Sequence, residues 1–257
     1  MRHILIGYGE VGKAIYEVLK DTCEIEIHDP KMNLVVDEFA TDTTDVMMVA
    51  IPYGPLFEEI VSQYQRIFHA KHTLIFSSVP VGTSTMLGAV HSPIEGNHSD
   101  MASYINKHKR WVGGTDARII EFLYDAGFDL VIVARPEITE FLKLRSTTYY
   151  GLCIEFARYS KAVCDEIGMG YNLVKEYDQD YNALNNDMGL NDLNRYVLDP
   201  PEGRIGGHCV LPNIGLLQKQ KPWCGLLNYI EKVNNLSGFI DNIFEFTDSL
   251  KNIIKKK

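Results

Sequence analysis

The feature that most constrains the fold of this chain is a glycine-rich turn directly after its first apolar run. The run His3–Ile6 has the composition of a buried strand, and Gly7-Tyr8-Gly9-Glu10-Val11-Gly12 follows it and opens an amphipathic stretch, Val11–Leu19. Glycine allows a tight turn and a close approach of the backbone to a ligand. A strand, a G-x-G-x-x-G turn and a helix together predict that a pyrophosphate binds at the helix N-terminus, although an ordinary glycine-rich turn is the alternative.

Short apolar runs alternate with amphipathic stretches through the first half of the chain. The alternation predicts an α/β fold with an N-terminal Rossmann-type parallel sheet and helices on its faces. The predicted strands are His3–Ile6, Glu24–His28, Val46–Ile51, Leu74–Phe76, Ala89–Ser92, Arg110–Gly113 and Leu130–Val133. The predicted helices between them are Val11–Leu19, Pro55–Phe68 and Ala117–Ala126.

The pattern changes near residue 137, and no strong strand signal follows. Apolar residues at spacings of three and four predict one long helix over Ile138–Ile167. We expect two domains: residues 1–137 form an NAD-binding Rossmann domain, and residues 138–257 form a mostly helical domain with a Gly-Gly-His-Cys loop. Further helices are predicted at Asn172–Met188, Leu226–Val233 and Phe239–Ile254.

The cofactor is predicted to be NAD because Asp29 ends the second predicted strand, twenty residues after Gly9. A carboxylate there can accept hydrogen bonds from a ribose diol and repels a 2′-phosphate. The loops holding Pro52 and Ser78 follow two more strands and could face the cofactor, or could simply end those strands. The predicted cofactor-binding residues are Gly7, Tyr8, Gly9, Glu10, Val11, Gly12, Asp29, Pro52 and Ser78.

Composition and length exclude several classes of protein. The 257 residues include 25 Lys and Arg against 34 Asp and Glu, a net charge of −9, which is unsuited to a nucleic-acid backbone. No apolar run approaches the roughly 18–20 residues of a membrane span, and the N-terminus does not read as a signal peptide. The five cysteines and the histidines have no metal-ligand spacing. We therefore expect a cytoplasmic protein without a metal, a nucleic-acid partner or a membrane partner.

The segment Gly206-Gly207-His208-Cys209 is the most unusual stretch of the second half. Paired glycines let the backbone lie close to a ligand, and His208 could favour the thiolate of Cys209 as an exposed nucleophile. A buried cysteine beside a surface histidine is the alternative.

With this segment the chain resembles the UDP-glucose/GDP-mannose (nucleotide-sugar) dehydrogenase family. The resemblance implies that Cys209 is the catalytic nucleophile, that Lys143 is a catalytic lysine, that NAD is the cofactor and that the long helix forms a homodimer. Because the family ends in a second nucleotide-fold domain, we expect a short member that lacks it. The matching segments, in order, are Gly7–Gly12, the loop at Pro52, Ser77–Thr83, Trp111–Asp116, Glu140–Lys143 and Gly206–Cys209.

The chain departs from the family pattern at several of these positions. Thr147 stands where the family has an asparagine, Asn213 stands where it has a catalytic aspartate, and Ser78 replaces a threonine. Glu95 is displaced by one place from the family's acidic residue. The predicted catalytic residues are Cys209, Lys143 and Asn213, and the predicted substrate-binding residues are Glu95, Thr147, Gly206, Gly207 and His208.

The resemblance implies an NAD-dependent oxidoreductase that oxidises an alcohol of a sugar or sugar nucleotide, with Cys209 at the reacting carbon. The small-molecule substrate would lie in a cleft between the two domains, floored by residues 206–209 and reached by Lys143. Two alternatives remain open at this point. One is a non-catalytic NAD-binding protein with a degenerate site, and the other is a two-electron hydroxyacid-type dehydrogenase.

Overall fold

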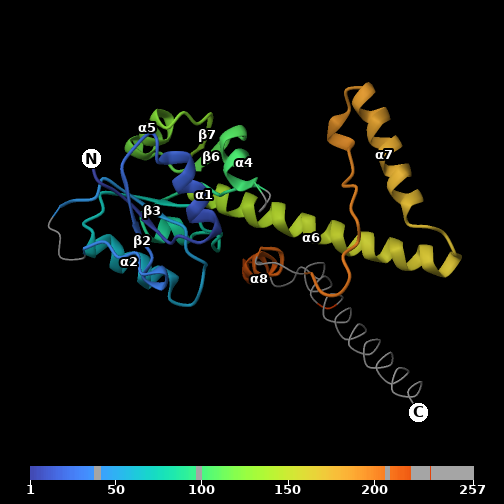
Figure 1. Cartoon of the computed structure of the whole chain (residues 1–257), viewed down its shortest axis with the longest axis horizontal. Coiled ribbons are helices and arrows are strands. Elements are labelled where there is room, and N and C mark those ends of the chain that lie inside the picture. The colour runs from blue at the N-terminus through green and yellow to red at the C-terminus, as the bar shows by residue number, and fades with distance from the viewer. Residues whose placement is uncertain (38–41, 97–99, 206–208, 221–231, 233–257) are drawn as a thin grey trace, which may run out of the picture. The chain divides into compact units, whose positions relative to one another are not determined.

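The computed structural model of the chain describes residues 1–37, 42–96, 100–205, 209–220 and 232 (Figure 1). The chain divides into two compact units, Met1–Arg145 and Ser146–Lys257. The division falls inside helix α6 (Pro136–Ile167), later than the boundary near residue 137 that the change of pattern suggests.

The first unit is built on a seven-stranded sheet with the order β2-β1-β3-β4-β5-β6-β7. Neighbouring strands are parallel except β5 and β6, which are antiparallel. The predicted Rossmann-type fold class is confirmed, with this one reversal in an otherwise parallel sheet. The strands are β1 (His3–Ile6), β2 (Ile25–His28), β3 (Val46–Val49), β4 (His72–Ile75), β5 (Val90–His91), β6 (Arg110–Gly113) and β7 (Leu130–Val133).

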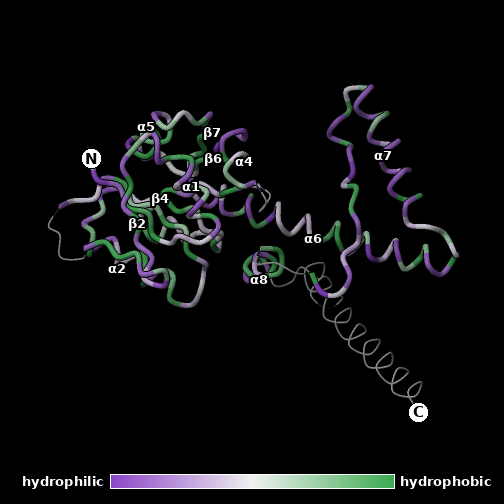
Figure 2. The backbone as a smooth tube through the Cα atoms, in the orientation of Figure 1, coloured by the Kyte–Doolittle hydropathy of each residue, from purple (hydrophilic) through white to green (hydrophobic). Residues whose placement is uncertain are grey.

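Alternate residues of the inner strands enter two separate cores. In β1, for example, Leu5 packs with α1 (Glu10–Leu19), while Ile4 and Ile6 pack with α2 (Phe57–Ile67). The strands are buried on both faces, which explains why they read as continuous apolar runs. Figure 2 shows hydrophobic stretches, drawn in green, among the strands of the first unit.

Two other short helices and one longer helix complete this unit. Helix α5 (Ala117–Asp125) agrees with the sequence pattern, but α3 (Thr83–Met86) and α4 (Met101–Lys107) were not expected. Their four and seven residues are too short to show helical periodicity.

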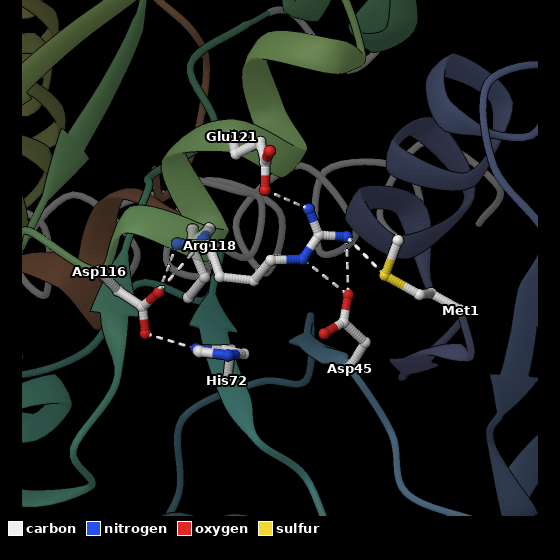
Figure 3. Close-up of polar contacts among 7 residues, drawn as sticks. Met1, Asp45, His72, Asp116, Arg118 and Glu121 are labelled. Carbon is white, nitrogen blue, oxygen red and sulfur yellow. Dashed lines mark hydrogen bonds and ion pairs between the residues drawn. The ribbon is translucent and has the colours of Figure 1, made fainter.

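A polar network joins the amino ends of the central strands to α5 (Figure 3). Arg118 on α5 donates from Nε to Oδ2 of Asp45, which precedes β3, at 2.8 Å. Asp116 accepts from the backbone N–H groups at the start of α5 and lies 2.7 Å from Nδ1 of His72, the first residue of β4. The network therefore fixes α5 to the edge of the sheet opposite the glycine turn.

The second unit contains the rest of α6, α7 (Asn172–Asp187) and α8 (Val210–Gln220). Helix α8 was not among the predicted helices, because Pro212 and Gly215 interrupt the helical pattern there. Proline is tolerated in the first turn of a helix. Apart from residue 232, the helices predicted at Leu226–Val233 and Phe239–Ile254 lie outside the described residues. No helix in the described part of the chain is long and apolar enough to cross a membrane.

Candidate functional site

The carboxyl edge of the sheet is the place where the fold can hold a ligand. The chain passes from β1 outward to β2 and then returns past β1 to β3, so the connections leave β1 and β3 in opposite directions. Ligands of open α/β sheets bind at such a switch point. The glycine turn begins there, because Gly7 donates its backbone N–H to His28 O at 2.9 Å, and Ala50 donates to Ile6 O at 2.8 Å.

The three glycines of the turn have different physical roles. Gly7 has φ of +91°, and a Cβ built at Gly12 would lie 2.1 Å from the carbonyl oxygen of Gly7, so neither position has room for a side chain. A Cβ at Gly9 would meet no atom within 4 Å. Gly7 and Gly12 are therefore required by the fold, whereas Gly9 leaves open space beside the first turn of α1. That space suits a pyrophosphate, as the sequence pattern predicts.

Asp29 lies against the same turn. Its Oδ2 accepts the backbone N–H of Tyr8 at 2.7 Å, and its Oδ1 accepts the backbone N–H of Lys31 at 3.1 Å. The carboxylate is half-buried, and each oxygen keeps a second lone pair for a ligand hydroxyl. The residues present thus fit a dinucleotide with a free ribose diol.

His91 fixes the start of the next loop, which contains Ser78. Its Nε2 lies 3.1 Å from Ser77 O and its Nδ1 lies 2.8 Å from Thr139 Oγ1 on α6. A carbonyl oxygen only accepts, so Nε2 carries the proton and Nδ1 accepts the threonine hydroxyl. Burial lowers the pKa of His91 to about 4, so the ring is neutral at neutral pH.

This shift predicts acid sensitivity. Between pH 4 and 6.5 the unfolded chain binds more protons at His91 than the folded chain, so stability is highest above pH 6.5 and falls as the pH approaches 4. The loss at this residue is about 3 kcal/mol. We expect urea unfolding to show that His91→Gln removes this part of the pH dependence. His108→Gln, at an exposed histidine, is the control, and equal pH profiles for wild type and His91→Gln would contradict the assignment.

Glu140 on α6 holds the other end of the same loop. Its carboxylate is fully buried and accepts the backbone N–H of Gly82 at 2.6 Å and that of Ser84 at 2.7 Å. Burial raises the pKa of Glu140, against the opposing effect of these hydrogen bonds. Ser78 is thereby carried on a segment anchored at both ends, while Pro52 is exposed directly beyond β3.

Lys143 and Glu95, predicted from different parts of the chain, are brought together. Lys143 Nζ donates to Ile94 O at 2.6 Å and lies 3.3 Å from Glu95 Oε2. The buried Arg110 of β6 donates to Pro93 O at 2.9 Å. Two cations therefore bind consecutive carbonyl groups and fix the loop that presents Glu95.

The second unit brings together the two residues that differ most from the family pattern. Asn213 on α8 is buried, and its Nδ2 donates to Oγ1 of Thr147 on α6 at 3.2 Å. Cys209 directly precedes α8, and its thiol is half-buried and free of any disulfide. The predicted residues Gly206, Gly207 and His208 lie outside the described residues.

The sequence analysis missed His91, Thr139 and Arg110, and it assigned no role to Glu140. A buried polar residue within a strand or a helix gives no sequence signal that separates it from an exposed one, so only the fold reveals these contacts. Glu140 offered a weak signal, since it belongs to the segment that matches the family. Cys209 and Lys143 lie in different units, and the cleft that would join them stays a prediction.

The strand order and the glycine turn define the first unit as a Rossmann-type α/β unit. A scan against models of protein families finds no match, and a search of curated proteins finds none either.

Solved structures do match. The chain superposes on UDP-D-ManNAc dehydrogenase from Pyrococcus horikoshii with a TM-score of 0.71 and 16% identity, covering 98% of this chain and 72% of that one. UDP-glucose dehydrogenase from Pyrobaculum islandicum matches with a TM-score of 0.67 and 17% identity, covering 93% of this chain and 68% of that one. 3-Hydroxyisobutyrate dehydrogenase from Mycobacterium tuberculosis matches with a TM-score of 0.66 and 12% identity, covering 91% of this chain and 92% of that one. The chain therefore has the fold of these dehydrogenases, and the resemblance seen in the sequence is confirmed at the level of the fold.

Proposed function

We propose that this protein is an NAD-dependent oxidoreductase that oxidises an alcohol group of a sugar or sugar nucleotide. The observation that carries the proposal is the glycine turn at the β1/β3 switch point, which is open at Gly9 and flanked by the Asp29 carboxylate. Nucleotide-sugar dehydrogenases among the fold neighbours support the substrate class.

In this proposal each group of the turn has one task. The backbone at Gly9 and the start of α1 hold the pyrophosphate, and Asp29 accepts hydrogen bonds from the ribose diol. Bound NAD supplies a hydride acceptor for the carbon that carries the alcohol. The loop anchored by His91 and Glu140 presents Ser78 at the same edge of the sheet.

Cys209 is proposed to act at the reacting carbon. The alcohol first loses a proton and a hydride to give an aldehyde, and the thiolate then adds to the aldehyde carbon as a thiohemiacetal. Transfer of a second hydride from the thiohemiacetal to a second molecule of NAD, with loss of its hydroxyl proton, would leave a thioester on Cys209, which water must hydrolyse. Lys143 is proposed to stabilise the substrate oxygen, and Glu95, 3.3 Å from its Nζ, to support it.

A two-electron hydroxyacid-type reaction is the second candidate. The match to 3-hydroxyisobutyrate dehydrogenase, which covers 92% of that chain, favours it. In that case Cys209 takes no covalent part, and one NADH forms for each substrate. A protein that binds NAD without turning over any alcohol is the third reading.

The homodimer through the long helix is also proposed. Large apolar side chains of the second unit, including Phe156, Tyr159 and Tyr177, are more than 60% exposed and would be covered by a second copy. The mass of the protein in solution tests this, and a monomer at micromolar concentration would contradict it.

Cofactor titration tests the proposed function directly. We expect calorimetry to show tighter binding of NAD than of NADP, because a 2′-phosphate would meet the Asp29 carboxylate. Asp29→Ala should weaken NAD binding by about tenfold or more, the effect of losing a charged hydrogen-bond acceptor, and should reduce the discrimination. Asp21→Ala, at an exposed aspartate, is the matched control.

The opposite preference would overturn the cofactor assignment. If NADP binds more tightly than NAD, or if Asp29→Ala binds both cofactors like wild type, Asp29 does not read the ribose. Absence of binding by either cofactor would remove the oxidoreductase proposal altogether.

A further inference from the structure

One face of α6 seats the segment that carries Cys209. Thr147, Gly151, Ile154 and Arg158 recur at intervals of four, three and four residues, so they lie along one side of the helix. Each of the four contacts a residue of 201–205 or of 210–214, on one side or the other of Cys209. We refer to these four residues as the α6 stripe.

The first two residues of the stripe hold α8. Thr147 accepts the side-chain N–H of Asn213 at 3.2 Å. A Cβ added at Gly151 would lie 2.8 Å from Val210 Cγ1 and 3.3 Å from Ile214 Cδ1, so α8 packs directly against the backbone of α6 there. The start of α8, immediately after Cys209, therefore has little freedom to shift along α6.

The third residue holds both flanks of the Gly-Gly-His-Cys segment. Ile154 forms one small buried cluster with Ile205, Val210 and Ile214. Ile205 precedes the paired glycines, and Val210 follows Cys209. The two flanks of the segment thus share one core on the same helix face.

Arg158 fixes the backbone before the segment. Its Nε donates to Pro201 O at 3.1 Å and its Nη2 donates to Gly203 O, while its Nη1 pairs with Glu155 Oε1 at 2.7 Å. The two charged side chains are only 12% and 5% exposed. A buried ion pair is a poor source of stability, because desolvation offsets most of the attraction. Its value here lies in the two backbone carbonyl groups that the guanidinium fixes in place.

We propose that Arg158 is a positioning residue for Cys209. By binding the carbonyl groups of Pro201 and Gly203 it tethers the approach to the segment, while the rest of the α6 stripe holds α8 beyond it. A reacting thiol must be held close to its productive position, because small displacements cost large factors in rate. This inference rests on the proposed role of Cys209 at the reacting carbon.

The test measures the thiol itself, without any need for turnover. We would compare the rate of Cys209 alkylation by iodoacetamide in wild type, Arg158→Ala and Arg158→Lys, using peptide mass mapping. Arg158→Ala should raise the rate about tenfold, the shift expected from loss of one or more charge-assisted hydrogen bonds. Arg158→Lys should return it towards wild type, since an ammonium can still bind one carbonyl group.

Two controls show whether a change in the alkylation rate of Cys209 is due to the loss of the Arg158 contacts. Lys161→Ala removes a surface ion pair with Asp165 on the same helix and should leave Cys209 alkylation unchanged. The alkylation rates of Cys23, in the first unit, and of the buried Cys164, in the second unit, should be the same in every variant, which shows that each unit stays folded.

The outcomes separate this inference from the proposed function. If iodoacetamide alkylates Cys209 of Arg158→Ala at the wild-type rate, the positioning role is overturned, whether or not the protein oxidises alcohols. If the rate changes as expected while wild type oxidises none of a panel of sugars, sugar nucleotides and hydroxyacids, the positioning role stands and the proposed function fails. Where turnover is found, Arg158→Ala should lower kcat with little change in KM, and a changed KM with unchanged kcat would count against positioning.

Discussion

Replacing Gly12 by alanine is expected to destabilise the first unit by about 3 kcal/mol or more and to abolish NAD binding. The new Cβ would lie 2.1 Å from the carbonyl oxygen of Gly7 and 2.9 Å from its carbonyl carbon. These are backbone atoms of the turn, so they cannot rotate away as a side chain could. Either α1 or the turn must move, and the geometry that faces the pyrophosphate is lost. Urea unfolding and calorimetric titration with NAD measure the two effects.

Gly9→Ala is the matched comparison, because it adds the same methyl group two residues from Gly7. Gly9 has φ of −73°, which alanine adopts readily, and the new Cβ meets no atom within 4 Å. The stability should therefore change by no more than about 0.5 kcal/mol. NAD affinity should nevertheless fall, since the methyl group occupies the proposed pyrophosphate space. Wild-type affinity in Gly9→Ala would show that the ligand binds elsewhere.

The second large effect concerns how far the oxidation proceeds. An amide at position 213 cannot take a proton from water, and a missing general base costs about 10²–10⁴-fold in a hydrolytic step. We therefore expect wild type to release one NADH per substrate, or to accumulate an acyl group on Cys209 visible by intact mass. Asn213→Asp should accelerate thioester hydrolysis and raise the yield towards two NADH.

The hydrogen bond at this position can survive the substitution, although the buried site raises the cost of a charged carboxylate. Asn213 donates to the Thr147 hydroxyl at 3.2 Å, and an aspartate there could accept from the same hydroxyl, so the contact survives with its direction reversed. Brisk formation of two NADH per substrate by wild type would mean that another group replaces the carboxylate, with Glu95 and Lys143 the first to examine. Full activity in Cys209→Ser would exclude covalent catalysis and favour the hydroxyacid-type reaction.

The first unit could be predicted from the sequence because its signals are local and strong. Seven apolar runs, one glycine turn and a carboxylate after the second strand specify the sheet and its edge. The reversal at β6 could not be predicted, because direction within a sheet depends on the path of the connection, which short helices such as α4 leave ambiguous. Helix α8 was not predicted for a different reason: Pro212 and Gly215 interrupt its helical pattern, although burial of Val210 and Ile214 stabilises the helix.

In the candidate site, too, the residues with local signals could be predicted and those with distant partners could not. Glycines and Asp29 are recognisable because their roles depend on neighbours in sequence. His91 and Glu140 form hydrogen bonds with partners 14 to 58 residues away, and no local sequence pattern predicts such a contact. The pairing of Thr147 with Asn213, 66 residues apart, was equally invisible, although both positions had been singled out separately.

Because strand β6 is antiparallel to β5, residues at its two ends support opposite edges of the sheet. Arg110, at its start, supports the Glu95 loop at the carboxyl edge, whereas Asp116, just beyond its end, belongs to the network with His72 and Arg118 at the opposite edge. A protein engineer can therefore seek heat tolerance among the charges around Asp116, which lie at the edge of the sheet opposite the glycine turn.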